Sequence, residues 1–95
     1  MSKKEVWKYQ PEMDTVLDED TTESKHLILH NDEVNTFDFV IENLIKICKM
    51  DSVQAEQCTF LVHYKGKCDV KKGTHNYLKP FKEALNDKGL EATIE

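Results

Sequence analysis

The spacing of hydrophobic residues predicts a strand followed by two helices. The run KHLILH (25–30) is rich in β-favouring residues and predicts a strand. In NTFDFVIENLIKICKM (35–50), hydrophobic residues recur every three or four positions, which predicts an amphipathic helix. A second helix is expected from Asp51, a capping residue with Gln54 three positions later, to Gly66, which favours a helix end. This second helix is hydrophobic over most of its circumference, so we expect it to be covered on both sides.

The rest of the chain predicts a strand, a helix and a final strand. KCDVKKG (67–73) is typical of a strand, and THNYLKPFKEALNDKG (74–89) has helical spacing. Because proline fits only the first turn of a helix, Pro80 suggests that this helix begins near Tyr77 or is irregular before it. LEATI (90–94) alternates as a closing strand. The order β-α-α-β-α-β predicts a small α+β domain, in which three helices lie on one face of a three-stranded antiparallel sheet.

The first 24 residues lack this periodicity. They hold three Lys against seven Asp and Glu, a balance of −4 out of the chain's total of −5. A segment of this kind cannot bury enough apolar surface to fold alone. We therefore expect a flexible acidic N-terminal arm (1–24) and one small domain (25–95), which can hold a single compact core.

The composition of the chain argues against several classes of function. All 13 basic residues are Lys, so the planar contact by which Arg recognises phosphates and guanine is missing, and nucleic acid is a poor candidate partner. No run approaches the ~20 apolar residues that span a membrane, and no secretory leader is recognisable, so we expect a cytoplasmic protein. Three cysteines spaced ten apart (48, 58 and 68) fit neither a disulfide framework nor a zinc site, and we interpret them as reduced thiols packed like small apolar groups.

Catalysis, a cofactor and a metal site are not expected either. Cys58 and His63 lie on one predicted helix but about 140° apart around it, so they do not form a nucleophile and base pair. The chain has only three Gly and no phosphate-binding loop. His26, His30 and His75 have no spacing typical of metal ligands.

The two predicted helices must form a tight hairpin, because only Met50 and Asp51 separate them. The start of the first helix then lies beside the end of the second, and the loop HNDEVN (30–35) hangs over the same end. This predicts a shallow apolar indentation with a polar rim. The rim is formed by Asn31, Asp32, Glu33 and His63, and the apolar part by Phe37, Val40, Thr59 and Val62. Such a site suits a cation next to a bulky apolar group, as in a peptide's free N-terminus with a hydrophobic first residue.

These residues also carry a family resemblance. LILHNDEVNTFDFVIENL (27–44) followed by QAEQCTFLVHYKGK (54–67) resembles the ClpS family of adaptor proteins, most closely over residues 25–68. The resemblance implies an adaptor of the N-end rule pathway that binds substrate proteins through a first residue such as Phe, Leu, Trp or Tyr. It also implies delivery to an AAA+ unfoldase of the ClpA or ClpC type for degradation by the Clp protease. The adaptor is expected to act as a monomer.

The resemblance assigns roles to individual residues. It implies that Asn31, Asp32 and His63 bind the α-amino group, that Glu33 is an acidic position of the loop, and that Val40, Val62 and Leu90 line the hydrophobic pocket. Phe37 and Thr59 stand at two pocket positions where the family often has methionine. The segment DVKKGTHNYLKPF (69–81) departs from the family more strongly, in a region associated with unfoldase docking.

Plainer interpretations of the same residues stay open. Asn31 and Asp32 are common turn residues, Asn35 is a candidate N-cap for the first helix, and His63 could be a partly buried histidine satisfied within the fold. A different class of function is also compatible with the arrangement: a docking domain similar to the C-terminal domain of the ribosomal stalk protein, which has no pocket for an amine. Only the pairing of Asp32 with His63 separates the two.

Overall fold

The computed structural model describes residues 23–95, which form an α+β domain with the predicted order of elements. The predicted arm lies outside the described residues, apart from its last two. In the part of the chain that is described, none of the helices is long and apolar enough to cross a membrane. The elements are β2 (Lys25–His30), α1 (Phe37–Cys48), α2 (Ser52–Lys65), β3 (Lys67–Gly73), α3 (His75–Asp87) and β4 (Glu91–Ile94).

The sheet has the order β3-β2-β4, and both pairings are antiparallel, as predicted. Leu29 in the central strand lies opposite Cys68 of β3 and Ala92 of β4. The β2–β3 register shifts between Leu27 and Ile28, which indicates a β-bulge. The central strand therefore ends at His30 with a neighbour on each side, and the loop that follows starts from a fixed position.

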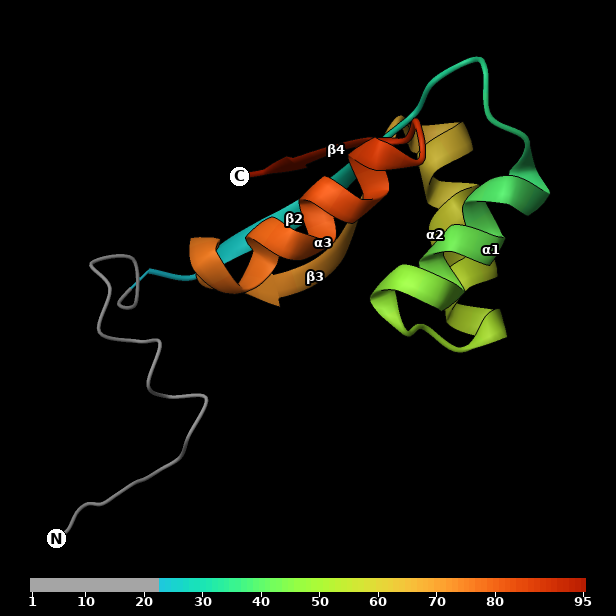
Figure 1. Cartoon of the computed structure of the whole chain (residues 1–95). Coiled ribbons are helices and arrows are strands. Elements are labelled where there is room, and N and C mark those ends of the chain that lie inside the picture. Colours follow the sequence, from blue (N-terminus) through green and yellow to red (C-terminus); the bar gives the residue numbers. More distant parts are fainter. Residues whose placement is uncertain (1–22) are drawn as a thin grey trace, which may run out of the picture.

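One hydrophobic core joins the sheet to the helices. Figure 1 shows α3 running along the sheet, with the α1–α2 hairpin beside the end of β2. Burial of each leucine side chain contributes about 1.5–3 kcal/mol of transfer free energy. The largest fully buried apolar side chains are Leu27, Leu29, Leu44, Leu78 and Leu85.

Local capping explains the bounds of the hairpin helices. The Asp51 carboxylate accepts a hydrogen bond from the Gln54 backbone N–H (2.8 Å), and Gly66 ends α2 at a φ of 95°, both as the sequence predicts. The start of α1 differs from the prediction. Thr36, not Asn35, is the N-cap, and its hydroxyl accepts from the Phe39 N–H (3.1 Å).

Two further predictions about helices are wrong. The third helix begins at His75, because Thr74 caps it by accepting from the Tyr77 N–H (3.1 Å), and Pro80 therefore lies inside the helix. The second helix is not covered on both sides. Its outer apolar side chains, Val53, Phe60, Leu61 and Tyr64, are 44–77% exposed.

Candidate functional site

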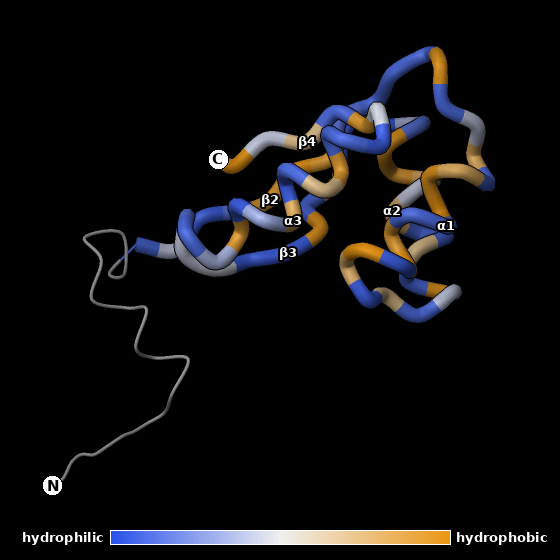
Figure 2. Tube along the Cα trace, in the orientation of Figure 1, coloured by the Kyte–Doolittle hydropathy of each residue, from blue (hydrophilic) through white to orange (hydrophobic). Residues whose placement is uncertain are grey.

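The predicted site lies where β2 ends. The loop 31–36 leaves β2 and passes over the C-terminal end of α2 before α1 begins, and Figure 2 shows this loop as mostly hydrophilic next to the hydrophobic strand. The Asn31 N–H donates to the Gly66 carbonyl (2.9 Å), which fixes the start of the loop on the end of α2. The helical hairpin and the loop therefore meet as the sequence predicts.

A small indentation lies at this meeting point. Its volume is about 10 Å³, roughly the space of one water molecule. A leucine-sized side chain can therefore enter only if the surrounding side chains move apart. The apolar lining comes from Leu29, Val40, Val62 and Leu90, and the polar lining from His30, Asn31, Asp32, Asn35 and His63.

The Asp32 carboxylate is held in place by three hydrogen bonds. Oδ1 accepts from the backbone N–H groups of Val34 and Asn35 (2.9 Å each), and Oδ2 accepts from the Asn35 side-chain amide (2.9 Å). Partial burial opposes ionisation, but the bonds from Asn35 and Val34, together with the nearby His63, outweigh it and lower the pKa of Asp32. Asp32 is therefore a fixed anion at neutral pH.

Asn35 connects this anion to the other side of the domain. Its side-chain amide donates both to Asp32 and to the Gly89 carbonyl (2.9 Å), which lies in the turn between α3 and β4. Leu90, the next residue, is buried and lines the indentation. One amide therefore sets the position of the carboxylate relative to the apolar wall.

His63 presents its imidazole from the last turn of α2. Its Nδ1 is 3.2 Å from the Thr59 carbonyl oxygen, one turn earlier, so this nitrogen donates the hydrogen bond. In the neutral ring, that tautomer leaves Nε2 as an acceptor. The Phe37 ring packs 5.0 Å away from the imidazole, centroid to centroid, and restricts its rotation.

The predicted residues divide into two groups in this structure. Asn31, Asp32, His63, Val40, Val62 and Leu90 all line the indentation. Phe37 lies beside it, against His63 and Phe60. Thr59 is fully buried, with its hydroxyl donating to the Ala55 carbonyl (2.8 Å), and Glu33 is exposed on the loop; neither belongs to the lining.

Three lining residues escaped the sequence analysis. Asn35 was predicted to cap α1, although its spacing of three from Asp32 could have suggested a side-chain contact. Leu29 was assigned only to the predicted strand, and His30 to no site. All three follow from the direction in which β2 and the loop run, which no local pattern specifies.

A second, more open hollow shares part of this wall. It lies on the α3–β4 side of Asp32 and is lined by Asp32, Val34, Asn86, Gly89, Leu90 and Glu91. Asp32 and Leu90 therefore line both hollows. A chain whose first residue occupied the indentation could continue along this second surface.

Chemically, the site offers acceptors for a cation beside an apolar wall. A carboxylate, an amide and an imidazole can accept hydrogen bonds from an ammonium group, and the leucine and valine side chains of the lining can contact hydrocarbon. Within residues 23–95, no group of three or more His, Cys, Asp or Glu side chains is arranged to hold a metal ion.

The chain is similar to known adaptor proteins. Residues 20–93 match the family model described as ATP-dependent Clp protease adaptor protein ClpS. The ClpS adapter proteins of Vibrio cholerae strains O395 and N16961 are each 39% identical over 72 residues, which cover 70% of this chain and 66% of theirs. The structure of Agrobacterium tumefaciens ClpS2 bound to L-phenylalaninamide superposes with a TM-score of 0.65 at 19% identity, covering 76% of this chain and 94% of that one, and so shows the same fold.

Proposed function

Because this chain belongs to the ClpS family of Clp protease adaptor proteins, we propose that it captures substrate proteins by a free, hydrophobic N-terminal residue. It then hands them to an AAA+ unfoldase of the ClpA or ClpC type for degradation. The part of the proposal that concerns the N-terminal residue rests on the site, and the part that concerns the unfoldase rests on the family.

The observation that carries the proposal is the fixed carboxylate of Asp32 beside His63 and an apolar wall. A carboxylate has about four acceptor positions, and Asp32 uses three of them within the loop. The remaining one can accept a hydrogen bond from an α-ammonium group. Because the carboxylate is already positioned, little ordering free energy is lost when the ligand binds.

The other two ammonium protons find acceptors from neighbouring residues. The Nε2 of His63 is one acceptor, since Nδ1 is engaged with the Thr59 carbonyl. The side-chain oxygen of Asn31 is the second. An α-amine with a pKa of about 8 is mostly protonated at neutral pH, so it can donate three hydrogen bonds.

The side chain of the first residue fills the indentation between Val40, Val62 and Leu90. That the related ClpS2 binds L-phenylalaninamide, which joins a free amine to an aromatic side chain, supports this class of ligand. Since the indentation has room for only about one water molecule here, we expect ligand entry to move the rim. Phe37 packs on His63 from outside the indentation and is the rim side chain best placed to move.

A panel of short peptides that differ only in the first residue tests the proposal. We expect peptides beginning with Phe, Leu, Trp or Tyr to bind, those beginning with Ile or Val to bind poorly, and those beginning with Ser or Asp not to bind. If all peptides bound equally or none bound, the generic docking domain without an amine pocket would be the better interpretation.

The hand-over step needs a separate test. Delivery is measured as the degradation rate of a Phe-first reporter protein by a Clp protease assembled with ClpA or with ClpC, with and without this chain. We expect acceleration with one of the two unfoldases. Removal of residues 1–20 should reduce delivery while leaving peptide affinity unchanged, because the lining of the indentation comes from residues 29–90.

A further inference from the structure

Two cysteines meet inside the domain, away from the lining of the indentation. Cys58 lies on α2 and Cys68 on β3, and their Sγ atoms are 2.7 Å apart. Both residues are buried, with 4% and 9% of their surfaces exposed. The third cysteine, Cys48, lies on α1 and is also buried.

We propose that Cys58 and Cys68 form a reversible disulfide bond that joins α2 to β3, and that this pair is an oxidation site of the protein. The site is independent of the function proposed above, because it needs no peptide and no unfoldase.

The geometry requires only a small movement. A disulfide bond is about 2.05 Å long, so the two sulfur atoms need to approach by well under an ångström. The backbone between them already holds the two elements together, because α2 ends at Lys65 and β3 begins at Lys67 after a single turn residue. The residue between them, Gly66, is held by a hydrogen bond from the Asn31 N–H to its carbonyl (2.9 Å).

One thiolate is enough to start disulfide formation, and the hydrogen bond between the two sulfur atoms indicates which residue supplies it. The Cys58 thiol donates a hydrogen bond to the Cys68 sulfur, which lowers the pKa of Cys68 against the opposing effects of burial and Asp69. The same bond, together with burial, raises the pKa of Cys58. Cys68 is therefore the thiolate that forms first, and it lies on β3, which is an edge strand of the sheet.

Hydrogen peroxide is a suitable two-electron oxidant for this pair. The Cys68 thiolate attacks one peroxide oxygen, the O–O bond breaks, and a sulfenic acid and hydroxide result. The Cys58 sulfur then attacks the sulfenic sulfur, the S–O bond breaks and the S–S bond forms. The Cys58 proton leaves with the departing oxygen. Overall, two thiols and one peroxide give one disulfide and two waters, and a dithiol reductant reverses the change.

Cys48 provides a matched control. It is as buried as Cys58, and burial raises the pKa of its thiol. No hydrogen bond between Cys48 and the other two cysteines occurs among the contacts of the described domain, so Cys48 should not react in place of either. Cys48→Ala removes a buried thiol while leaving the pair intact.

The test is intact-mass spectrometry of the full-length protein, reduced, desalted and then exposed to about one equivalent of hydrogen peroxide under native conditions. We expect the mass to fall by two hydrogen atoms, the peptide map to contain a Cys58–Cys68 link, and dithiothreitol to restore the original mass. Cys48→Ala should behave in the same way. Cys58→Ala and Cys68→Ala should each lose the response while keeping a native circular dichroism spectrum.

The wild-type peptide map remains decisive if either of the last two variants fails to fold. A link that involves Cys48, or a protein that keeps three free thiols while a control dithiol is oxidised, would overturn the proposal. The melting temperature gives a second readout. The oxidised form should melt roughly 5 °C or more above the reduced form, because the bond restricts the unfolded chain. An oxidised form that melts at or below the reduced one would show that the fold resists the bond.

Discussion

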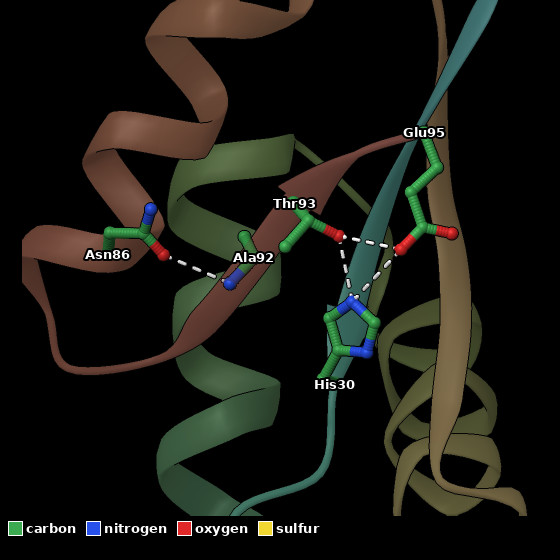
Figure 3. Close-up of polar contacts among 5 residues, drawn as sticks. All are labelled: His30, Asn86, Ala92, Thr93 and Glu95. Carbon is green, nitrogen blue, oxygen red and sulfur yellow. Dashed lines mark hydrogen bonds and ion pairs between the residues drawn. The ribbon is translucent and has the colours of Figure 1, made fainter.

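The domain contains two clusters that combine a histidine, a carboxylate and a neutral polar side chain. The strand cluster consists of His30, Thr93 and Glu95, and Figure 3 shows these three side chains directed at one another. His30 Nε2 lies 2.8 Å from the Thr93 hydroxyl and 3.5 Å from the Glu95 carboxylate, and the Thr93 hydroxyl donates to Glu95 (3.0 Å). In the same view, the Ala92 N–H donates to the Asn86 side chain (2.9 Å) and holds β4 against α3.

The loop cluster consists of Asp32, Asn35 and His63. Here the carboxylate is held mainly by backbone N–H groups and by the amide of Asn35, while the imidazole is held by the Thr59 carbonyl. Asp32 and Asn35 are hydrogen-bonded to each other as well as to backbone groups, and His63 is held separately by the Thr59 carbonyl. All three line one indentation. His30 of the strand cluster also lines the indentation. The strand cluster, however, uses its polar atoms on one another, so it stabilises the pairing of β2 with β4. Under the proposed function, the loop cluster keeps acceptor positions for a ligand.

The difference shows that residue type alone does not define a binding site. Both clusters have a histidine and a carboxylate. Only in the loop cluster does each side chain also form a hydrogen bond with a backbone group outside the cluster's own side chains. We therefore expect substitutions in the loop cluster to change peptide binding strongly, and substitutions in the strand cluster to change mainly stability.

The largest effect is expected from Asp32→Ala. Loss of a charged hydrogen bond of about 1.5–3 kcal/mol weakens binding of a Phe-first peptide by roughly tenfold to more than a hundredfold. Asp32→Asn, which keeps the shape but removes the charge, should behave similarly. Fluorescence anisotropy gives the affinity, and circular dichroism checks the fold. Retention of wild-type affinity by both variants would remove Asp32 from the site.

The next effect concerns pH. The α-amine loses its proton with a pKa of about 8, so affinity should fall about tenfold between pH 7 and pH 9. On the acid side, the lowered pKa of Asp32 keeps its carboxylate charged until the pH falls below the usual value of 3.8. The stability that this lowered pKa contributes is present above the unfolded value and is lost as pH falls through the folded one. Calorimetric titrations across this range measure the fall of peptide affinity at high pH and at low pH. An affinity that stayed constant up to pH 10 would exclude recognition of the ammonium form.

A smaller effect is expected from Asn35→Ala. The variant loses one hydrogen bond to Asp32 and one to the Gly89 carbonyl, so affinity should fall about twofold to tenfold. If Asn35 had a purely structural role, the pH at which affinity falls on the acid side would not change. Loss of the amide donor should raise the pKa of Asp32, so binding should disappear at a higher pH than in the wild type. If binding were lost at the same low pH in the variant and in the wild type, Asn35 would not position the carboxylate.

Much of this arrangement could be predicted from local pattern. Capping by Asp51, the stop at Gly66 and the bond from Thr59 to Ala55 all depend on residues within one helical turn. The short connection between α1 and α2 then places the loop next to His63, so no contact distant in sequence is needed to predict this. For the same reason, five of the predicted site residues line one indentation, and Leu90, which only the family resemblance implied, lines it as well.

The remaining features depend on contacts distant in sequence. Asn35 and Thr36 are both good capping residues, and Asn35 instead donates to Gly89, 54 positions away. Hydropathy likewise could not distinguish the covered side of α2 from the exposed side that carries Phe60 and Tyr64, because the outcome depends on which elements pack there. Pro80 is accommodated within α3 because the cap at Thr74 and the burial of Leu78 and Leu85 fix that helix from its first turn.

The smallest effect is expected in the strand cluster. Glu95→Gln removes the charge that faces His30 but keeps an acceptor for Thr93, and the Glu95 side chain is half exposed. Peptide affinity should stay within about twofold, and the free energy of unfolding should change by no more than about 1 kcal/mol. Urea denaturation and the same anisotropy assay measure the two quantities. A loss of affinity as large as that of Asp32→Ala would mean that the two clusters act as one.

Recognition of a free α-amino group is tested most directly by one pair of peptides, identical in sequence with Phe first, of which one is N-acetylated. Acetylation removes the positive charge and two of the three donor protons but leaves the aromatic side chain unchanged. The free peptide should bind, and the acetylated peptide should bind at least tenfold more weakly, by isothermal titration calorimetry at pH 7. Equal affinity for the two peptides would contradict the amine site at Asp32 and His63.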